Sequence, residues 1–246
     1  VGQNGAGKTT LLRLIAGLMK PTKGNILCYM EKDYIGYMPQ SCRFDGAQTV
    51  ASTIQFFSAL RNADMQNGLR LCQKLELDTA KRVKHLSPGQ QKKLQMVIAM
   101  TGDPDFYILD EPTAGLDPNA SHEMNKLIQE LHQQGKSILI SSHILQDMDD
   151  ICTNVAIMES GRLIYDRQLE SSYIIETSIV PDKLFTQLAQ KFSLSSNQER
   201  TLIHAKTDRE GVAALIGALT ANSVLVYEAV HSNVKDVVQE QLHMNN

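Results

Sequence analysis

Residues 2–9 combine glycines, a lysine and a hydroxyl at a spacing suited to binding phosphate. They read GQNGAGKT and fit the pattern G-x-x-x-x-G-K-[ST] at every fixed position. Glycines let backbone N–H groups curl around phosphate oxygens in conformations that a Cβ would forbid. We expect Lys8 to contact the β- and γ-phosphates of a nucleotide and the Thr9 hydroxyl to ligate Mg²⁺. The sequence therefore predicts a phosphate-binding loop.

A pair of acidic residues ends a short apolar run later in the chain. Residues 106–109 read FYIL, which predicts a strand buried on both faces, and Asp110 and Glu111 follow it. Ligands of open α/β sheets collect at the carboxyl ends of the strands. We expect Asp110 to hold Mg²⁺ through its water shell and Glu111 to polarise the water that attacks the γ-phosphate. By itself the pair could also be a solvated acidic turn, and the glycine loop favours the catalytic reading.

Residues 86–90, LSPGQ, have the features of a helix start. Ser87 is suited to the N-cap, Pro88 to the first helical position, where its missing N–H costs nothing, and Gln90 to the third. Together they predict a capping box. The residue types alone indicate a well-formed helix start and no more.

The glycine loop needs a strand before it and a helix after it. Apolar residues recur at helical spacing behind the loop, at Leu11, Leu14, Ile15 and Leu18. They predict a helix whose N-terminal dipole faces the anion and which ends near Pro21 and Gly24. Only Val1 could belong to the preceding strand. We therefore expect that strand, and the side chain that stacks on the nucleotide base, to lie upstream of residue 1.

Strands and helices alternate along the rest of the first two thirds of the chain, which predicts a mostly parallel sheet. Residues 41 to about 100 are predicted to be mostly helical, with one helix from Thr49 to Arg61. Another helix begins at Asp117 and has the inward-facing residues Met124, Leu127, Ile128 and Leu131. Strands are predicted at 137–141, 155–158 and 162–165.

The motifs stop at about residue 168. Strands are predicted at 173–180, 202–206 and 224–230, and helices at 182–192, 210–221 and 234–242. This alternation suggests a small α+β unit of ferredoxin-like type. A structural or dimer-supporting role is favoured for it, and a regulatory ligand-binding role is the alternative.

The composition excludes several classes of protein. The chain has 246 residues, 42% of them apolar and 21% charged, an ordinary globular mixture that a disordered chain would not have. A net charge of −3 argues against a strongly basic nucleic-acid binder. No apolar run approaches the roughly 18 residues that a membrane span needs. The scattered cysteines favour reduced thiols in a cytosolic protein.

The motifs GQNGAGKTT, YMPQ, LSPGQ, YILDEP, AGLDP and SSH occur in this order across residues 1–165. The set resembles the ATP-binding-cassette (ABC) ATPase family. The resemblance implies an α/β fold, the RecA-like P-loop NTPase with a mostly parallel sheet and a helical subdomain at about 41–100. It further implies a nucleotide-binding domain over residues 1–167, followed by a small accessory α+β domain at 168–246.

The resemblance also implies the ligands and the roles of residues. The cofactors would be ATP and Mg²⁺, with two cassettes packed head to tail around each nucleotide. Nucleotide contacts are expected from Gly2, Gln3, Asn4, Gly5, Ala6, Gly7, Lys8, Thr9, Thr10, Ser87, Gly89, Gln90 and Asp117. Gln40 would join Thr9 and Asp110 at the metal and would sense the attacking water. His143 would contact the γ-phosphate and hold that water against Glu111.

One position departs from the family's signature. Pro88 stands where the usual signature has glycine. The first position of a helix can lose its N–H without cost, and Gly89 keeps its own donor, so we expect a competent site.

The implied function is that of an ATP-hydrolysing subunit that drives a separate transmembrane permease together with a second ATPase subunit, without binding nucleic acid. It would work on the cytoplasmic, inner face of the cell membrane. The segments IGYMPQ, EPTAGLDP and GRLIYD are similar to those of multidrug and lipid-type exporters, so export is favoured. The alternatives are an ABC importer, a soluble ABC ATPase of translation or DNA maintenance, a GTPase or kinase, and a binding module with a dead site. The absence of a second glycine loop argues against the soluble ATPase, and the LSPGQ segment and His143 argue against a GTPase or kinase. The presence of Lys8, Asp110, Glu111 and His143 argues against a dead site.

Overall fold

Three parallel strands form the centre of the part of the chain that carries the motifs. The computed structural model describes residues 1–28, 35–142, 152–168 and 172–232. Strands β1 (Ile35–Met38), β2 (Phe106–Asp110) and β3 (Ser137–Ser141) pair in the order β1-β2-β3. Tyr107, Ile108 and Leu109 of β2 have no exposed surface, as expected for a central strand that is covered on both faces. The carboxyl ends of the three strands therefore meet at one edge.

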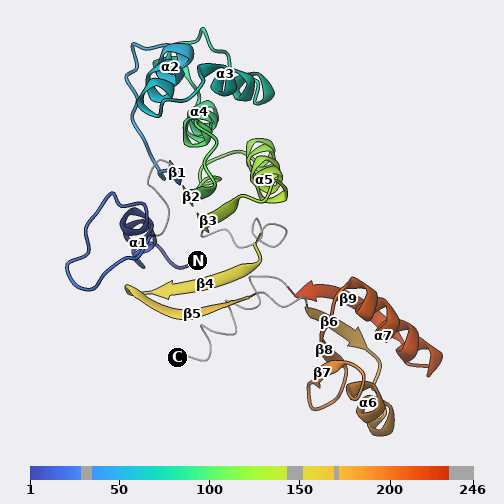
Figure 1. Cartoon of the computed structure of the whole chain (residues 1–246). Coiled ribbons are helices and arrows are strands. Elements are labelled where there is room, and N and C mark those ends of the chain that lie inside the picture. Colours follow the sequence, from blue (N-terminus) through green and yellow to red (C-terminus); the bar gives the residue numbers. More distant parts are fainter. Residues whose placement is uncertain (29–34, 143–151, 169–171, 233–246) are drawn as a thin grey trace. The chain divides into compact units, whose positions relative to one another are not determined.

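The chain divides into two compact units (Figure 1). The first consists of residues 1–151 and 157–164, and the second of residues 152–156 and 165–246. We keep the division into a nucleotide-binding domain at 1–167 and an accessory domain at 168–246 as a prediction.

Five α-helices of the first unit are described. They are α1 (Lys8–Ile15), α2 (Val50–Leu60), α3 (Met65–Lys74), α4 (Pro88–Met100) and α5 (Pro118–Gln133), with a short 3-10 helix at Val83–His85 before α4. The predicted helix from Thr49 to Arg61 is confirmed as α2, and Thr49 and Ser52 form its capping box. The mostly helical character predicted for residues 41–100 is also confirmed.

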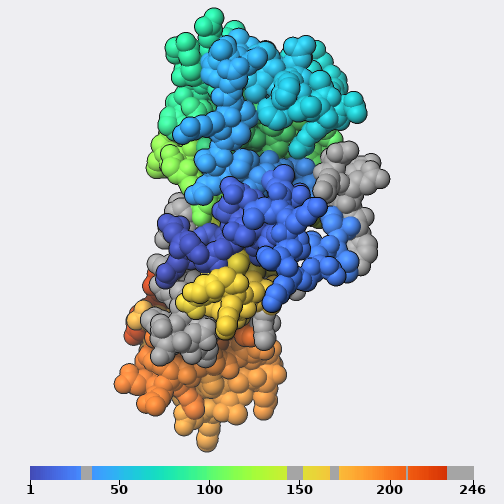
Figure 2. All heavy atoms as spheres, turned by 90° about the vertical axis from the view of Figure 1, so that its left-hand side faces the viewer, coloured from blue at the N-terminus to red at the C-terminus, as the bar shows by residue number. Residues whose placement is uncertain are grey.

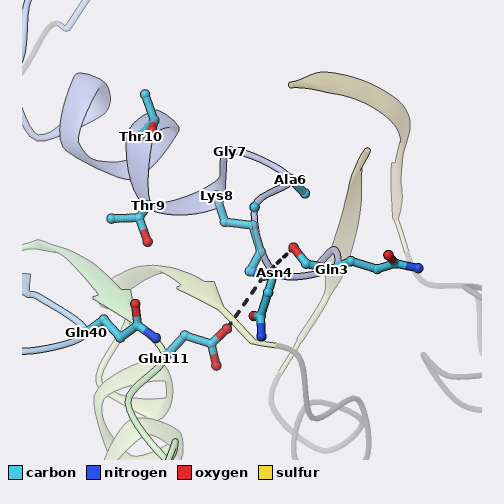
Figure 3. A pocket seen from close by; sticks show the side chains of 10 residues that line it. Gln3, Asn4, Ala6, Gly7, Lys8, Thr9, Thr10, Gln40 and Glu111 are labelled. Carbon is cyan, nitrogen blue, oxygen red and sulfur yellow. Dashed lines mark hydrogen bonds and ion pairs between the residues drawn. The ribbon is translucent and has the colours of Figure 1, made fainter. Parts of the chain in front are cut away.

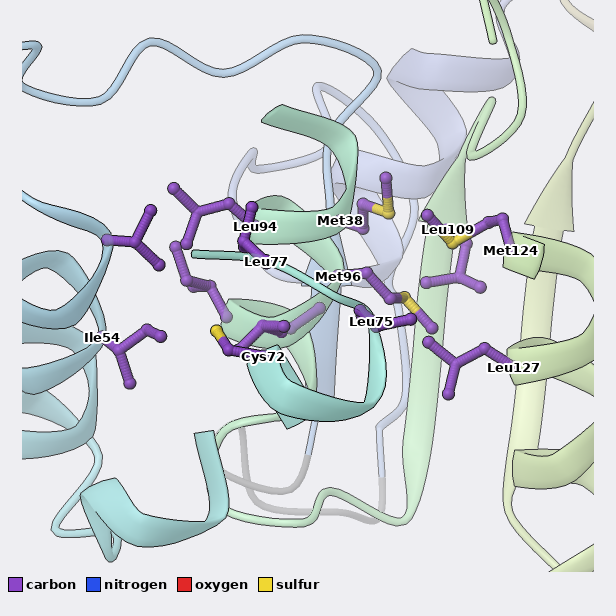
Figure 4. Packing of buried hydrophobic residues seen from close by; sticks show 14 of the residues in the cluster. Met38, Ile54, Cys72, Leu75, Leu77, Leu94, Met96, Leu109, Met124 and Leu127 are labelled. Carbon is purple, nitrogen blue, oxygen red and sulfur yellow. The ribbon is translucent and has the colours of Figure 1, made fainter. Parts of the chain in front are cut away.

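One apolar core joins the helices to the sheet (Figure 4). Ile54 of α2, Cys72 of α3 and Leu94 of α4 have no exposed surface and lie in this core together with Leu109 of β2. The four residues predicted to face inward from α5 are all buried in the same core, at Met124, Leu127, Ile128 and Leu131. The core therefore fixes α4 and α5 against the strands that end at the candidate site.

Helix α1 differs from its prediction in both its length and its buried face. It ends at Ile15, before Pro21, because Gly17 takes a φ of 69° and closes the last turn. The buried residue is Leu12, which packs against Ile35 and Ile108. Leu11 and Leu18 are 36% and 60% exposed, so their predicted place on the apolar face is wrong. Leu12, Ile15 and Ala16 pack against the sheet, and they have helical spacing just as the predicted set Leu11, Leu14, Ile15 and Leu18 does. Only the position of the sheet decides which of the two sets is buried.

Strands β4 (Asn154–Glu159) and β5 (Arg162–Gln168) form a two-stranded sheet. They confirm the strands predicted at 155–158 and 162–165. Ser160 and Gly161 make the turn between them with positive φ values of 48° and 81°.

The second unit has its own sheet and its own core. Its elements are β6 (Ser172–Thr177), α6 (Asp182–Ala189), β7 (Ser193–Ser196), β8 (Leu202–Lys206), α7 (Arg209–Ala221) and β9 (Val226–Ser232). The strands are antiparallel in the order β7-β8-β6-β9. Ile175, Ile203 and Leu215 lie at the centre of the core. This βαββαβ order is the one that defines a ferredoxin-like arrangement.

The sequence prediction for this unit lacked strand β7. The four residues of β7 read SLSS, three of them serine, so they carry neither the apolar alternation nor the β-branched side chains by which a strand is recognised. The helix predicted at 234–242 lies outside the described residues. Within the described ranges, no helix has the length and apolar character needed to cross a membrane.

Candidate functional site

The glycine loop runs directly into the first turn of α1. Gly7 is the N-cap of α1 and has a φ of 102°, which side chains with a Cβ rarely adopt. A Cβ on Gly2 would lie 2.3 Å from the carbonyl oxygen of Met158, so only glycine permits this approach to β4. The N–H of Met158 donates to the Val1 carbonyl at 2.8 Å, and the N–H of Gly161 to the Ala6 carbonyl at 2.9 Å. Strand β4 and its turn therefore hold the loop in place.

The loop and the carboxyl ends of two strands enclose one cavity (Figure 3). Its volume is about 230 Å³. The lining residues are Gln3, Asn4, Gly5, Ala6, Gly7, Lys8, Thr9, Thr10, Gln40 and Glu111. The structure thus brings together residues that lie far apart in the sequence. Figure 2 shows the loop and α1, in dark blue, on the surface of the first unit.

Lys8 lies inside the loop. Its Nζ donates to the carbonyl oxygens of Gly2 at 2.6 Å and Gln3 at 3.2 Å. The same Nζ is 3.7 Å from Oε1 of Glu111, and the two side chains are only 9% and 5% exposed. A buried ammonium next to a buried carboxylate lowers the cost of burying either charge. Both groups face the cavity, where one can attract phosphate and the other can accept a proton.

Asp110 precedes Glu111 at the end of β2, is fully buried and does not line the cavity. The Ser141 hydroxyl donates to its Oδ1 at 2.6 Å. Its Oδ2 is buried and has no hydrogen-bond partner among the described residues. A buried carboxylate oxygen without a donor is costly unless a water or a cation satisfies it. Together with the Thr9 and Gln40 side chains at the cavity wall, this oxygen fits the oxygen-rich surroundings that Mg²⁺ prefers.

A magnesium ion here would be held by few protein ligands. The described parts of the chain contain no group of three or more His, Cys, Asp or Glu side chains that could hold a metal by themselves. Mg²⁺ in nucleotide sites usually keeps several waters and is bound through one or two carboxylates and the phosphates of the substrate. The residues present match that pattern.

Glu111 has an unusual backbone conformation. Its φ is 51°, in the left-handed region, which costs of order 1 kcal/mol or more for a residue with a side chain. Its N–H donates to the carbonyl and the hydroxyl oxygens of Ser141, at 3.1 and 3.0 Å. Ser141 therefore orients both acidic residues. Sequence reasoning missed this role and treated Ser141 only as the end of a strand, although parallel pairing places that end beside Asp110.

Lys92 is a second residue that sequence reasoning missed. It lies on α4 and is only 9% exposed. Its Nζ donates to the carbonyl oxygens of Gln40 at 2.8 Å and Glu111 at 3.0 Å. Burial lowers the pKa of Lys92, and the charges of Asp110 and Glu111 act in the opposite direction. In the sequence Lys92 has no feature that separates it from its neighbour Lys93.

The predicted helix start at Ser87 is confirmed. The Ser87 hydroxyl accepts from the N–H of Gln90 at 3.2 Å, Gln90 Oε1 accepts from the N–H of Ser87 at 3.1 Å, and Pro88 is the first helical residue. Ser87 is exposed and Gly89 is half-buried. Asp117, also exposed, caps α5. None of these residues lines the cavity described above, and His143 lies outside the described residues.

Comparisons with known proteins agree on one family. The model of the "ABC transporter" family matches residues 1–114. The ABC transporter ATP-binding protein NatA of Bacillus subtilis is 33% identical over 195 residues, covering 72% of this chain and 79% of that protein. The Nod factor export ATP-binding protein I of Burkholderia orbicola is 34% identical over 179 residues, covering 67% of this chain. The chain spans only 59% of the length of that relative.

Solved structures show the same fold. An ATP-binding subunit of an ABC transporter superposes with a TM-score of 0.63 at 26% identity, covering 77% of this chain and 80% of the other. A dimeric ATP-binding cassette with bound ADP and Pi has a TM-score of 0.60 at 21% identity, covering 68% and 83%, and supports the fold alone. The fold is therefore the P-loop α/β fold of ABC ATPase domains. The chain belongs to the family of ABC transporter ATP-binding proteins.

Proposed function

We propose that the chain binds ATP with Mg²⁺ and hydrolyses it to drive a separate transmembrane permease. The observation that carries this proposal is the cavity, in which a phosphate-binding loop, an ammonium, a glutamine and a buried carboxylate face one space. Membership of the family of ABC transporter ATP-binding proteins supports it.

The described residues have distinct parts in this reaction. Backbone N–H groups of the loop at Gly5 and Gly7 and the first turn of α1 bind phosphate oxygens. The Lys8 ammonium, which donates to the Gly2 and Gln3 carbonyls, offsets the charge on the β- and γ-phosphates. Glu111 orients the attacking water and accepts its proton. Its position depends on the two bonds from its N–H to Ser141.

Thr9, Gln40 and Asp110 are the residues that would hold Mg²⁺. The ion would neutralise charge on the phosphate oxygens as the bond to the leaving group breaks. Gln40 also lines the cavity together with Glu111 and is suited to sense whether the ion and the water are present. His143 is proposed to contact the γ-phosphate.

A second ATPase subunit completes the site in this proposal. Ser87, Gly89 and Gln90 at the start of α4 and Asp117 at the start of α5 do not line the cavity of their own chain. The exposed positions of Ser87 and Asp117 suit contact with a nucleotide held by another copy.

Export is the favoured direction of transport. Several relatives are named Nod factor export ATP-binding proteins, and the exporter-like segments of the sequence agree with them. The subunit would then work at the cytoplasmic face of the membrane. An importer ATPase and a soluble ABC ATPase remain the alternatives, and co-purification with a membrane permease distinguishes the transport roles from the soluble one.

The substitution Glu111→Gln tests the proposed reaction. It removes the proton acceptor and keeps the size of the side chain, so ATP should still bind while hydrolysis slows at least about 100-fold. A dimer closed around uncleaved ATP should accumulate. Nucleotide titration, phosphate release and light scattering measure the three effects.

The matched control is Glu130→Gln, which makes the same change on the surface of α5. It should hydrolyse ATP at the rate of the unsubstituted chain. Normal turnover in Glu111→Gln would refute the assignment of the base.

A further inference from the structure

Lys92 of helix α4 places a buried ammonium group against the backbone of the candidate site. The Lys92 ammonium reaches two carbonyl oxygens at once, that of Gln40 after β1 and that of Glu111 after β2, at 2.8 and 3.0 Å. The reaction proposed above uses the side chains of Gln40 and Glu111 and assigns no part to Lys92. A lysine is seldom buried unless its charge and its donors are satisfied. Its location therefore requires an explanation beyond packing.

A second residue of α4 holds the same segment. With its amide oriented so that both polar atoms are satisfied, Gln95 donates to the Pro39 carbonyl and accepts from the N–H of Cys42, both at 3.3 Å. Lys92 and Gln95 are three residues apart and so lie on one face of the helix. Between them they bind the backbone before, at and after Gln40. Lys92 alone also reaches Glu111.

The neighbouring lysine shows that this arrangement is specific to position 92. Lys93 Nζ donates to the Leu75 carbonyl at 3.0 Å and pairs with Glu123 at 2.6 Å, away from the cavity. The two lysines lie on the same helix and have the same charge and side-chain length. They differ in which residues their ammonium groups contact.

We propose that Lys92 is a positioning residue for ATP hydrolysis. It fixes the backbone at Gln40 and Glu111 relative to each other and to α4, the helix that Ser87 caps. This inference rests on the proposed function. The physical reason is that one ammonium donates to both carbonyls, so neither strand end can move without breaking a charge-assisted hydrogen bond. A displacement of about 1 Å in a group that orients the attacking water can slow a reaction about 100-fold.

The test compares Lys92→Met with Lys93→Met in the full chain. Methionine keeps the unbranched apolar stem of the side chain and removes the ammonium donor. For Lys92→Met we expect kcat for ATP hydrolysis to fall at least tenfold, while the Kd for ATP stays within about threefold, because the loop at 2–10 binds the phosphates without Lys92. Lys93→Met should leave both values unchanged. Lys92→Gln carries the same expectation as Lys92→Met and replaces it if the methionine variant does not fold.

A second measurement needs neither ATP nor turnover. Amide hydrogen exchange in the nucleotide-free chain reports how firmly the Glu111 N–H is held against Ser141. We expect Lys92→Met to accelerate exchange at Glu111 at least tenfold and Lys93→Met to have no such effect. Unchanged exchange in the Lys92 variant, or an unchanged kcat, overturns the inference. If the unsubstituted chain binds no ATP, the proposed function fails, and the exchange data still decide whether Lys92 fixes this backbone.

Discussion

At the scale of single residues, the cavity depends on charges that satisfy one another. Lys8 is within 3.7 Å of Glu111 and bonds to two loop carbonyls, and the Asp110 carboxylate takes a hydrogen bond from Ser141. The two oxygens of the Asp110 carboxylate therefore differ. Oδ1 accepts a hydrogen bond, and Oδ2 has no hydrogen-bond partner among the described residues. The site is therefore suited to receive a cation and an anion together.

Substituting Lys8 tests the anion-binding half of this arrangement. Lys8→Ala removes the ammonium that bonds to Gly2 and Gln3, so the phosphates lose their nearest positive charge. We expect the affinity for ATP to fall at least about tenfold, because hydrogen bonds to charged groups contribute roughly 1.5–3 kcal/mol. Calorimetric titration measures the change, with Lys20→Ala on the exposed segment after α1 as the control. An ATP affinity equal to that of the unsubstituted chain would count against the loop assignment.

At the scale of elements, the first turn of α4 decides whether the signature segment can work with proline at position 88. The capping box at Ser87 and Gln90 is intact, and Pro88 occupies the position at which a helix needs no N–H. The N–H of Gly89 remains. The departure from the family's usual glycine therefore leaves the start of the helix unchanged.

Substituting glycine at this position tests that conclusion. Pro88→Gly should leave the ATPase rate within about threefold. It should lower the free energy of unfolding by about 0.4–1 kcal/mol, because glycine gives the unfolded chain more freedom. Pro118→Gly makes the same change at the first position of α5 and should cost a similar amount. Phosphate release and denaturant titration measure the two effects. A tenfold gain in rate for Pro88→Gly would mean that the proline impairs the site.

At the scale of the whole molecule, the two compact units have separate apolar cores. Leu94 lies in the core of the first unit and Leu215 in that of the second, and neither has any exposed surface. All residues of the first core belong to the first unit, and all residues of the second core belong to the second unit. We therefore expect each unit to respond by itself to a defect in its own core.

The same substitution in each core tests this expectation. Leu215→Ala should destabilise the second unit by about 2–5 kcal/mol and leave the affinity for ATP within about twofold. Leu94→Ala should destabilise the first unit and slow ATP hydrolysis, measured as phosphate release, since α4 holds the backbone at Gln40 and Glu111. Hydrogen exchange assigns each loss of stability to its unit, and nucleotide titration gives the affinities. A tenfold loss of ATP affinity in Leu215→Ala would show that the units depend on one another.

Local features of this protein were predictable from its sequence. The conformations of the glycine loop, the start of α2 at Thr49, the capping box of α4 and the buried strand β2 follow from residues that are neighbours along the chain. Backbone sterics, side-chain caps and apolar runs act over a few residues, so residue type and spacing are sufficient for them. The family resemblance rests on these same short motifs.

Contacts between distant segments were decided only by the tertiary structure. Leu12 and not Leu11 is buried because the sheet lies on that side of α1. Lys92 and not Lys93 reaches the Gln40 and Glu111 carbonyls because the apolar core sets the rotation of α4. Ser141 acts on Asp110 and Glu111 because β3 pairs in parallel with β2. Strand β7, with three serines among its four residues, forms only because β8 offers it backbone partners. In each case the sequence allows two outcomes of nearly equal local energy, and packing between segments far apart in the chain selects one of them.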